Sequence, residues 1–309
     1  MKFGLIELFV DLNGILAESA SDAVCKGIRQ DPQKREETVR GAVDAARRCG
    51  CDFVVLPGWT LEASKPPGWL VELSLGRTIV FECLHPLKPQ KTQPVAKKGK
   101  ITPTISTAEI SPDASDYPWR TFVAEDGKLV VGPARQRVVQ AADLWSGEVL
   151  SENALALVSD LLAEGPIVRR WSVSGVGDAM LLICGEANFV GGGGRSKCWN
   201  HETVEKAGLT VQRLTSLKVI ANPSHTRSGP QALRDKRAWL SRGGILLHTA
   251  NIHSNGWKKV NGDGAVPGKA SHQAAIAWVQ GEREPVKLVI EAEKEREFVL
   301  KSVEWSPCS

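Results

Sequence analysis

Short apolar runs bounded by turn residues recur along the chain and predict buried strands at residues 2–10, 51–56, 77–82, 179–183, 217–221 and 244–250. Apolar residues at helical spacing, with charged residues on the opposite side, predict helices at residues 33–48, 151–163 and 230–241, and a further helix begins at 203–207. Because strands and helices alternate, the pattern favours an α/β fold.

Two turn signals predict hairpins. Asp126-Gly127 lies between apolar residues 122–124 and 128–131, and an Asp-Gly pair is a strong hairpin signal. Gln280-Gly281 lies between residues 274–279 and 286–291, which predicts a hairpin near the end of the chain. Hairpins together with crossover units indicate a mixed sheet or two packed sheets.

Residues 86–117 differ in composition from the rest of the chain, since Pro, Lys, Thr and Ser dominate there. We interpret this segment as a surface insertion in a single domain that spans residues 1–309. Its lysines favour a solvated loop over a site for an anionic partner, and nucleic-acid binding is not expected because interleaved aromatic residues are absent. The four glycines at 191–194 lack the Lys-Ser/Thr pair of a phosphate-binding loop and fit a site rim or a linker.

Composition places the chain among ordinary globular proteins, with 42% hydrophobic residues, 24% charged residues and a net charge of +4. No apolar stretch approaches the roughly 18 to 20 residues that cross a bilayer, and the N-terminus reads as a first strand, not a signal peptide. Seven cysteines without a repeating spacing indicate a reduced, cytoplasmic setting. Cys198 with His201 and His248 with His253 lack a second zinc-like pair, so we expect no metal and no cofactor.

Cys184 carries the main candidate chemistry. It follows the apolar run 179–183 and precedes a glycine, which places a thiol on a turn at the end of a strand, with Glu186 two residues later. Such a thiol is a candidate nucleophile where its surroundings favour the thiolate. Free cysteine is also a common buried core residue, so the local pattern alone leaves both interpretations open.

Several segments together resemble the nitrilase superfamily of carbon–nitrogen hydrolases in order and spacing. They are CDFVVLPGW (51–59), EDGKLVVGPARQRVV (125–139), DAMLLICGEANF (178–189), LKVIANPS (217–224) and KRAWLSRGGILLHTAN (236–251). The resemblance implies a four-layer α-β-β-α sandwich, a homodimer or larger homo-oligomer, and a small amide- or nitrile-like ligand. It assigns Cys184 to the nucleophile position, which attacks the amide or nitrile carbon.

Two of the three catalytic positions that the resemblance implies are occupied by other residues. Gly58 stands where a glutamate base should follow Pro57, and Gln136 stands where a lysine should stabilise the oxyanion. A slip of one residue in the alignment would place Arg135 or Arg137 there instead. Glu148 matches an auxiliary glutamate of the family. Glycine cannot accept a proton, and general acid–base help typically contributes about 10²–10⁴-fold in rate.

Two hypotheses follow. The first is a nitrilase-like protein that keeps the cysteine but has lost the standard chemistry, and we favour it because of Gly58 and Gln136. The alternative is an active amidase, nitrilase or acyl transferase with a rebuilt site, in which Glu186, Glu62 or Glu148 replaces the base and Arg135 or Arg137 replaces the cation. The apolar face of the helix at 230–241, with Leu233, Trp239 and Leu240, either contacts a second subunit or is buried within the monomer.

Overall fold

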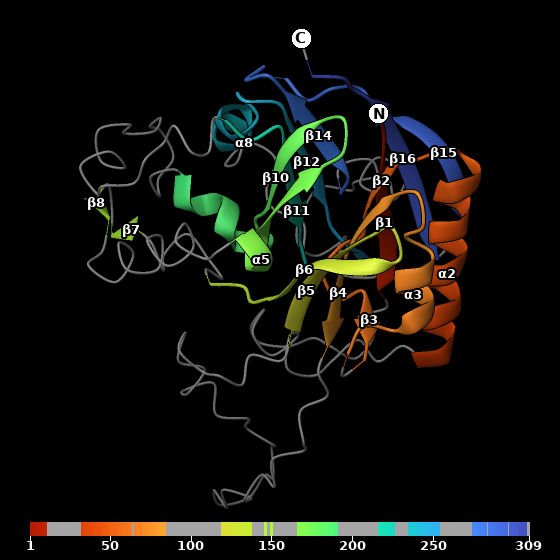
Figure 1. The fold of residues 1–309 in the computed structure, drawn as a ribbon. Coiled ribbons are helices and arrows are strands. Elements are labelled where there is room, and N and C mark those ends of the chain that lie inside the picture. The colour runs from red at the N-terminus through yellow and green to blue at the C-terminus, as the bar shows by residue number, and fades with distance from the viewer. Residues whose placement is uncertain are drawn as a thin grey trace, which may run out of the picture.

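β-Sheets stacked face to face form the centre of the described part of the chain (Figure 1). The computed structural model describes residues 1–10, 32–63, 65–84, 119–137, 145–146, 149–150, 166–190, 216–225, 234–253, 274–282, 284–295 and 297–307. Side chains from the inner faces of both main sheets form one apolar core, which includes Phe3, Leu5, Val80, Leu181, Val219 and Leu247.

The larger sheet has the order β15-β16-β1-β2-β4-β5-β6, with β13 beside β1 and β3 beside β4. Its strands are β1 (Lys2–Val10), β2 (Phe53–Val55), β3 (Leu61–Glu62), β4 (Thr78–Leu84), β5 (Trp119–Glu125), β6 (Lys128–Ala134), β13 (Ile252–His253), β15 (Val289–Lys294) and β16 (Phe298–Glu304). The central strands β1, β2 and β4 run parallel, so their carboxyl ends lie at one edge of the sheet.

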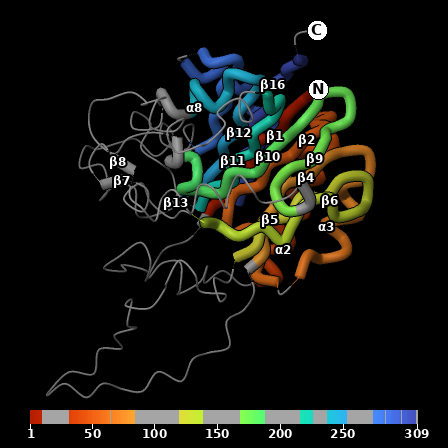
Figure 2. The backbone as a smooth tube through the Cα atoms, turned by 60° about the vertical axis from the view of Figure 1, so that its left-hand side comes forward, coloured from red at the N-terminus to blue at the C-terminus, as the bar shows by residue number. Residues whose placement is uncertain are grey.

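The smaller sheet has the order β14-β12-β11-β10-β9. Its strands are β9 (Arg170–Val173), β10 (Gly177–Leu181), β11 (Val219–Pro223), β12 (Ile245–Thr249) and β14 (Ile276–Val279). Strands β10, β11 and β12 are parallel neighbours, which Figure 2 shows side by side. A short ribbon of β7 (Trp145–Ser146) and β8 (Val149–Leu150) belongs to neither main sheet.

Helices cover the outer faces of the sheets. Helix α2 (Pro32–Arg48) packs on the larger sheet through buried Val39, Ala42, Val43 and Ala46, and α3 (Gly68–Glu72) lies on the same side (Figure 1). Helix α8 (Arg234–Leu240) covers the outer face of the smaller sheet, where its Arg237 contacts His248 of β12. The predicted four-layer α-β-β-α sandwich is therefore confirmed for the described residues. The short elements α5 (Pro166–Arg169) and η3 (Cys184–Val190), a 3-10 helix, lie on either side of the β9-β10 hairpin in sequence.

Most predicted elements are confirmed with adjusted ends: the strands at 2–10, 51–56, 77–82, 179–183, 217–221 and 244–250 correspond to β1, β2, β4, β10, β11 and β12. The Asp-Gly hairpin is also confirmed, because Asp126 and Gly127 both have positive φ and join β5 to β6. The predicted helices at 151–163 and 203–207, the insertion at 86–117 and the glycines at 191–194 lie outside the described residues.

The predicted hairpin of residues 274–279 with 286–291 is confirmed only at its turn, where Gln280 and Gly281 have positive φ, and does not extend into a ladder. Only a single bridge joins Ala277 to Val286, and β15 pairs with β16 in the other sheet instead. Pro285 lacks the N–H that a continuing ladder needs, and the chain crosses from one sheet to the other after this point.

Within the chain, α8 buries its apolar side chains. Trp239 is 4% exposed and Leu240 is 1% exposed, so this part of the predicted helix at 230–241 packs within the monomer. Leu233 lies outside the described residues. Among the described helices, none combines the length and the apolar character that crossing a membrane requires.

A buried ion pair lies on the inner face of the larger sheet. Glu7 of β1 shares its face with Phe3 and Leu5, and its carboxylate accepts hydrogen bonds from the Lys301 ammonium and, at 2.7 Å, from the Ala275 backbone N–H. Burial raises the pKa of Glu7 to about 7, although the Lys301 charge opposes that rise. The pair therefore gives stability a dependence on pH.

Candidate active site

Cys184 lies on a sharp turn directly after β10. Its φ is +47°, the left-handed region that non-glycine residues seldom adopt, and it begins the 3-10 helix η3. The residue is only partly buried, while Ile183 before it and Gly185 after it are buried. Backbone outliers of this kind concentrate at functional sites, where the surrounding structure holds them in place.

His225 lies next to the Cys184 sulfur. β10 and β11 are parallel neighbours, so Cys184 (three residues beyond the last residue of β10) and His225 (two beyond the last of β11) lie at the same sheet edge. The side chain and the backbone of His225, together with the Ser224 hydroxyl, lie close enough to the sulfur to lower the pKa of the Cys184 thiol. The pairing of a thiol with an imidazole is the arrangement that activates a cysteine nucleophile.

Glu82 orients the imidazole from the opposite sheet. Its Oε2 lies 2.7 Å from His225 Nε2, and the Glu82 side chain is 1% exposed. The same oxygen accepts the Trp59 backbone N–H at 2.7 Å, and Oε1 accepts the Thr121 hydroxyl at 3.4 Å. A carboxylate fixed in this way holds the ring in one orientation, which completes a nucleophile, base and orienting group in series.

Electrostatic interactions favour the charged forms of Cys184, His225 and Glu82. Burial opposes the imidazolium, but the Glu82 carboxylate and the Cys184 sulfur outweigh it and raise the pKa of His225 to about 10. Burial also disfavours the thiolate, yet the charge and hydrogen bonds of His225 hold the pKa of Cys184 below its usual range. Each charge therefore favours the other, and the site stabilises a thiolate beside an imidazolium relative to an ordinary cysteine.

The Gly58 position explains how the imidazole fits. A Cβ at Gly58 would lie 2.4 Å from His225 Cδ2, so any larger residue would meet the ring. The Trp59 ring stacks on the imidazole with centroids 5.0 Å apart and planes at 28°, and the Trp119 ring lies 6.1 Å away. His225 therefore occupies the space next to the position where the resemblance implies a glutamate base.

The segment around Gln136 is tied to the Cys184 turn. Glu186 accepts hydrogen bonds from Arg169 at 2.7 and 3.0 Å and from the Arg137 backbone N–H at 2.5 Å. Arg169 also donates to the Arg135 carbonyl. Gln136 is 8% exposed and lies in the sequence between these two anchored residues.

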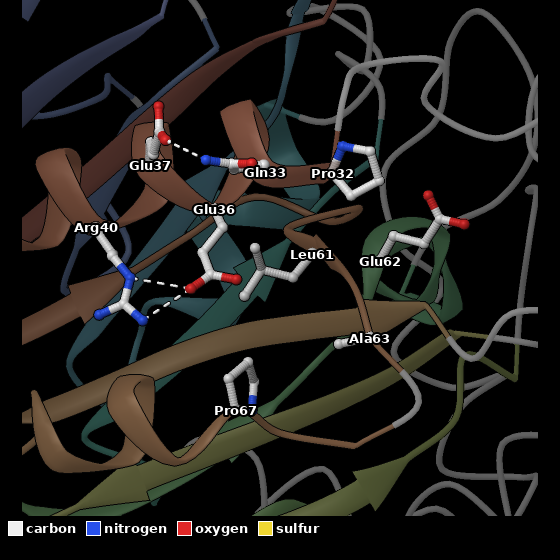
Figure 3. Close-up of a pocket in the computed structure, with 9 residues that line it drawn as sticks. All are labelled: Pro32, Gln33, Glu36, Glu37, Arg40, Leu61, Glu62, Ala63 and Pro67. Carbon is white, nitrogen blue, oxygen red and sulfur yellow. Dashed lines mark hydrogen bonds and ion pairs between the residues drawn. The ribbon is translucent and has the colours of Figure 1, made fainter.

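Two of the three glutamates considered as replacement bases have other surroundings. The Glu186 carboxylate also accepts the Ile183 N–H at 2.7 Å, and its Arg169 partner is fully buried, so its contacts hold the turn together. Glu62 is exposed and lines a surface groove of about 440 Å³ with Glu36 and Arg40, as Figure 3 shows. Glu148 lies outside the described residues.

His225 and Glu82 were missed in the sequence analysis. Each gave a signal: His225 follows Asn-Pro-Ser at the end of a predicted strand, and Glu82 is a charge at the end of the apolar run TIVF. Residues that follow the carboxyl ends of parallel neighbours meet at one edge, so the ends of β10 and β11 could have paired Cys184 with His225, whereas Glu82 lies within β4 of the other sheet.

Among the described residues, no group of three or more His, Cys, Asp or Glu side chains lies close enough together to hold a metal ion. His248 lies in β12 and contacts Asn222 and Arg237 instead. Cys198 and His201 lie outside the described part of the chain.

No protein-family model matches the chain, and no curated protein is similar to it in sequence. Solved structures resemble its fold at low identity. An amidase variant from Nesterenkonia sp. AN1, with acrylamide added to its active-site cysteine, has a TM-score of 0.48 and 11% identity over 99% of this chain and 93% of that chain. The glutamine-dependent NAD(+) synthetase of Cytophaga hutchinsonii has a TM-score of 0.45 and 10% identity over 98% and 42%, and the NitFhit protein of C. elegans has 0.47 and 11% over 98% and 60%. The chain thus spans most of the amidase but less than two thirds of the other two proteins.

Proposed function

We propose that this chain is a cysteine-dependent enzyme that cleaves a carbon–nitrogen bond by acyl transfer, with Cys184 as nucleophile, His225 as acid and base, and Glu82 as the orienting carboxylate. The observation that carries the proposal is the contact of His225 with both the Cys184 sulfur and, at 2.7 Å, the Glu82 carboxylate. The proposal takes up the second hypothesis from the sequence, with a base that differs from the three glutamates considered there.

The chemistry begins with the thiolate. The Cys184 sulfur attacks the amide carbon and forms a carbon–sulfur bond while the carbonyl electrons move to oxygen. The His225 imidazolium gives its proton to the departing amine, the carbon–nitrogen bond breaks, and a thioester remains. Neutral His225 then takes a proton from water, hydroxide adds to the thioester, and release of the carboxylic acid restores the thiolate–imidazolium pair.

The oxyanion needs donors that the family lysine would otherwise supply. The resemblance assigns that position to Gln136, whose side-chain amide carries two N–H groups and no charge. Its neighbours Arg135 and Arg137 are anchored to the Cys184 turn through Arg169 and Glu186. We assign Gln136 to the oxyanion, a role in which one donor is typically worth about 10²–10³-fold in kcat.

Hydrolysis of small amides and nitriles tests the proposal. Purified protein is incubated with a panel of aliphatic and aromatic amides and nitriles, and ammonia release is compared with that of Cys184→Ala and His225→Ala. Release that requires both residues supports the proposal. If the folded wild-type chain binds panel members, seen as a thermal shift, but releases no ammonia and forms no adduct at Cys184, the protein is the non-catalytic one of the first hypothesis.

Several expectations from the sequence stay predictions. They are the single domain over residues 1–309 with its insertion at 86–117, the cytoplasmic setting, and the homodimer or larger homo-oligomer. Light scattering on the purified chain measures the oligomeric state, with a mass near twice 33.5 kDa expected for a dimer.

A further inference from the structure

A chain of buried polar side chains runs from α8 through β12 and β11 to the Cys184 turn. Asn222 of β11 donates from Nδ2 to the carbonyl oxygen of Cys184 at 3.2 Å and to that of Leu182. Its Oδ1 lies 2.7 Å from His248 Nδ1, and His248 Nε2 lies 3.2 Å from Arg237 Nη2. Asn222, His248 and Arg237 are each 1% exposed.

The donors and acceptors in this chain allow one arrangement. Arginine only donates, so His248 Nε2 accepts a hydrogen bond from Arg237 and carries no hydrogen of its own. His248 Nδ1 therefore carries the N–H and donates a hydrogen bond to Asn222 Oδ1. The Asn222 amide is then fixed with its NH₂ group toward the two carbonyls. Burial and the Arg237 charge hold the pKa of His248 well below its usual range, which keeps this neutral tautomer in place.

Resting on the proposed function, we infer that Asn222, His248 and Arg237 are positioning residues that hold the Cys184 sulfur against His225. The Cys184 carbonyl is part of the same left-handed residue that carries the thiol, so the position of that carbonyl sets the position of the sulfur. The Asn222 amide holds this carbonyl by a hydrogen bond, and the hydrogen bond from His248 fixes the orientation of the amide. A shift of about 1 Å in a reacting group costs on the order of 10²-fold in rate.

Arg237 is itself held at the far end of the chain. Its guanidinium lies over the Trp278 ring at 4.9 Å from the ring centroid. An arginine stacked on an aromatic face is a rigid donor. The network therefore connects the outer helix layer to the nucleophile by side chains that each have one orientation.

The test uses substrate-independent and substrate-dependent measurements on the full chain. The variants are Asn222→Asp, which replaces the NH₂ donor by oxygen, His248→Leu, which removes both contacts, and His248→Gln, which keeps a donor and an acceptor. Ser241→Ala is the matched control, because Ser241 is also buried but bonds the Ala238 carbonyl and the Gly281 N–H, away from the turn. Alkylation of Cys184 by iodoacetamide is followed from pH 5 to 10, and kcat and KM are measured with an amide that the wild type cleaves.

We expect Asn222→Asp and His248→Leu to slow alkylation at pH 6.5 by roughly 10-fold and to lower kcat by about 10- to 100-fold, with little change in KM. His248→Gln should recover most of both, and Ser241→Ala should match the wild type. If folded Asn222→Asp and His248→Leu keep the wild-type alkylation profile and kcat, the inference is overturned. If His248→Leu does not fold, the result for Asn222→Asp alone decides. An ordinary thiol profile in the wild type would instead overturn the proposed function.

Discussion

Replacing Glu82 by glutamine removes the charge that holds His225 protonated while keeping the shape of the side chain. The pKa of His225 rises from 6.5 to about 10, which corresponds to roughly 5 kcal/mol in favour of the imidazolium at about 1.36 kcal/mol per pKa unit. Among the contacts that raise this pKa, the attraction of Glu82 is the largest. Breaking a buried pair typically costs about 3–5 kcal/mol, so Glu82→Gln should lower the pKa of His225 by about 2 units or more at about 1.36 kcal/mol per unit.

The loss should appear as slower reaction of the Cys184 sulfur. Without the Glu82 charge the imidazolium is less stable, so it lowers the pKa of Cys184 less and the thiolate fraction at pH 6–7 falls. Iodoacetamide labelling with quantification of the Cys184 peptide by mass spectrometry measures this directly. The rate in Glu82→Gln should recover above about pH 9, where hydroxide ionises the free thiol.

Glu125→Gln is the control for the Glu82 experiment. Glu125 lies on β5 beside Thr78, whose hydroxyl it accepts at 3.0 Å, at the opposite end of the β4-β5 pair from Glu82. It should alkylate as the wild type does. If folded Glu82→Gln also keeps the wild-type profile from pH 5 to 10, the carboxylate does not sustain the ion pair and the triad reasoning is refuted.

Three further changes probe other parts of the structure. Gly58→Ala should lower activity by at least about 10-fold, because its Cβ would lie 2.4 Å from the imidazole, and steady-state kinetics on folded protein would show normal kcat if this is mistaken. Glu186→Gln should reduce the free energy of unfolding by about 3 kcal/mol in denaturant titrations, because the carboxylate pairs with buried Arg169, and a variant as stable as the wild type would argue against that role. Lys301→Met should lower the free energy of unfolding more at pH 8 than at pH 5. Because the pKa of Glu7 is raised to about 7 in the folded chain, the stability that Glu7 contributes when protonated is lost as the pH rises through about 7. Lys301 limits that loss by pairing with the ionised carboxylate. Thermal unfolding at both pH values checks this, and equal losses would argue against it.

The sequence predicted the layers of the fold better than the contacts of the site. Apolar runs such as 179–183 and 217–221 became parallel neighbours because buried strands need partners on both sides, and helical periodicity alone identified α2. The last hairpin failed because turn residues at 280–282 do not say which sheet the next strand joins. That choice depends on packing between distant segments.

The candidate site shows the same limit more sharply. Cys184 was predicted from its position after a strand, and Gly58 was recognised as lacking a base. Neither observation could show that His225 lies beside Cys184 and Gly58. His225 follows a different strand from Cys184, and its partner Glu82 comes from the opposite sheet. Glu186 looked attractive through sequence proximity, yet its carboxylate faces Arg169, which no local pattern indicated.

Ionisation of the Cys184 sulfur by His225 is the claim on which the proposed chemistry depends, and ultraviolet absorbance near 240 nm measures it most directly, since a thiolate absorbs there and a thiol does not. The difference spectrum between the wild type and Cys184→Ser, titrated from pH 4 to 10, isolates this sulfur from the other cysteines. The structure predicts that the thiolate signal is already present at pH 7 and disappears only on acidification. A signal that emerges only above about pH 8.5, the value of an ordinary cysteine, would contradict it.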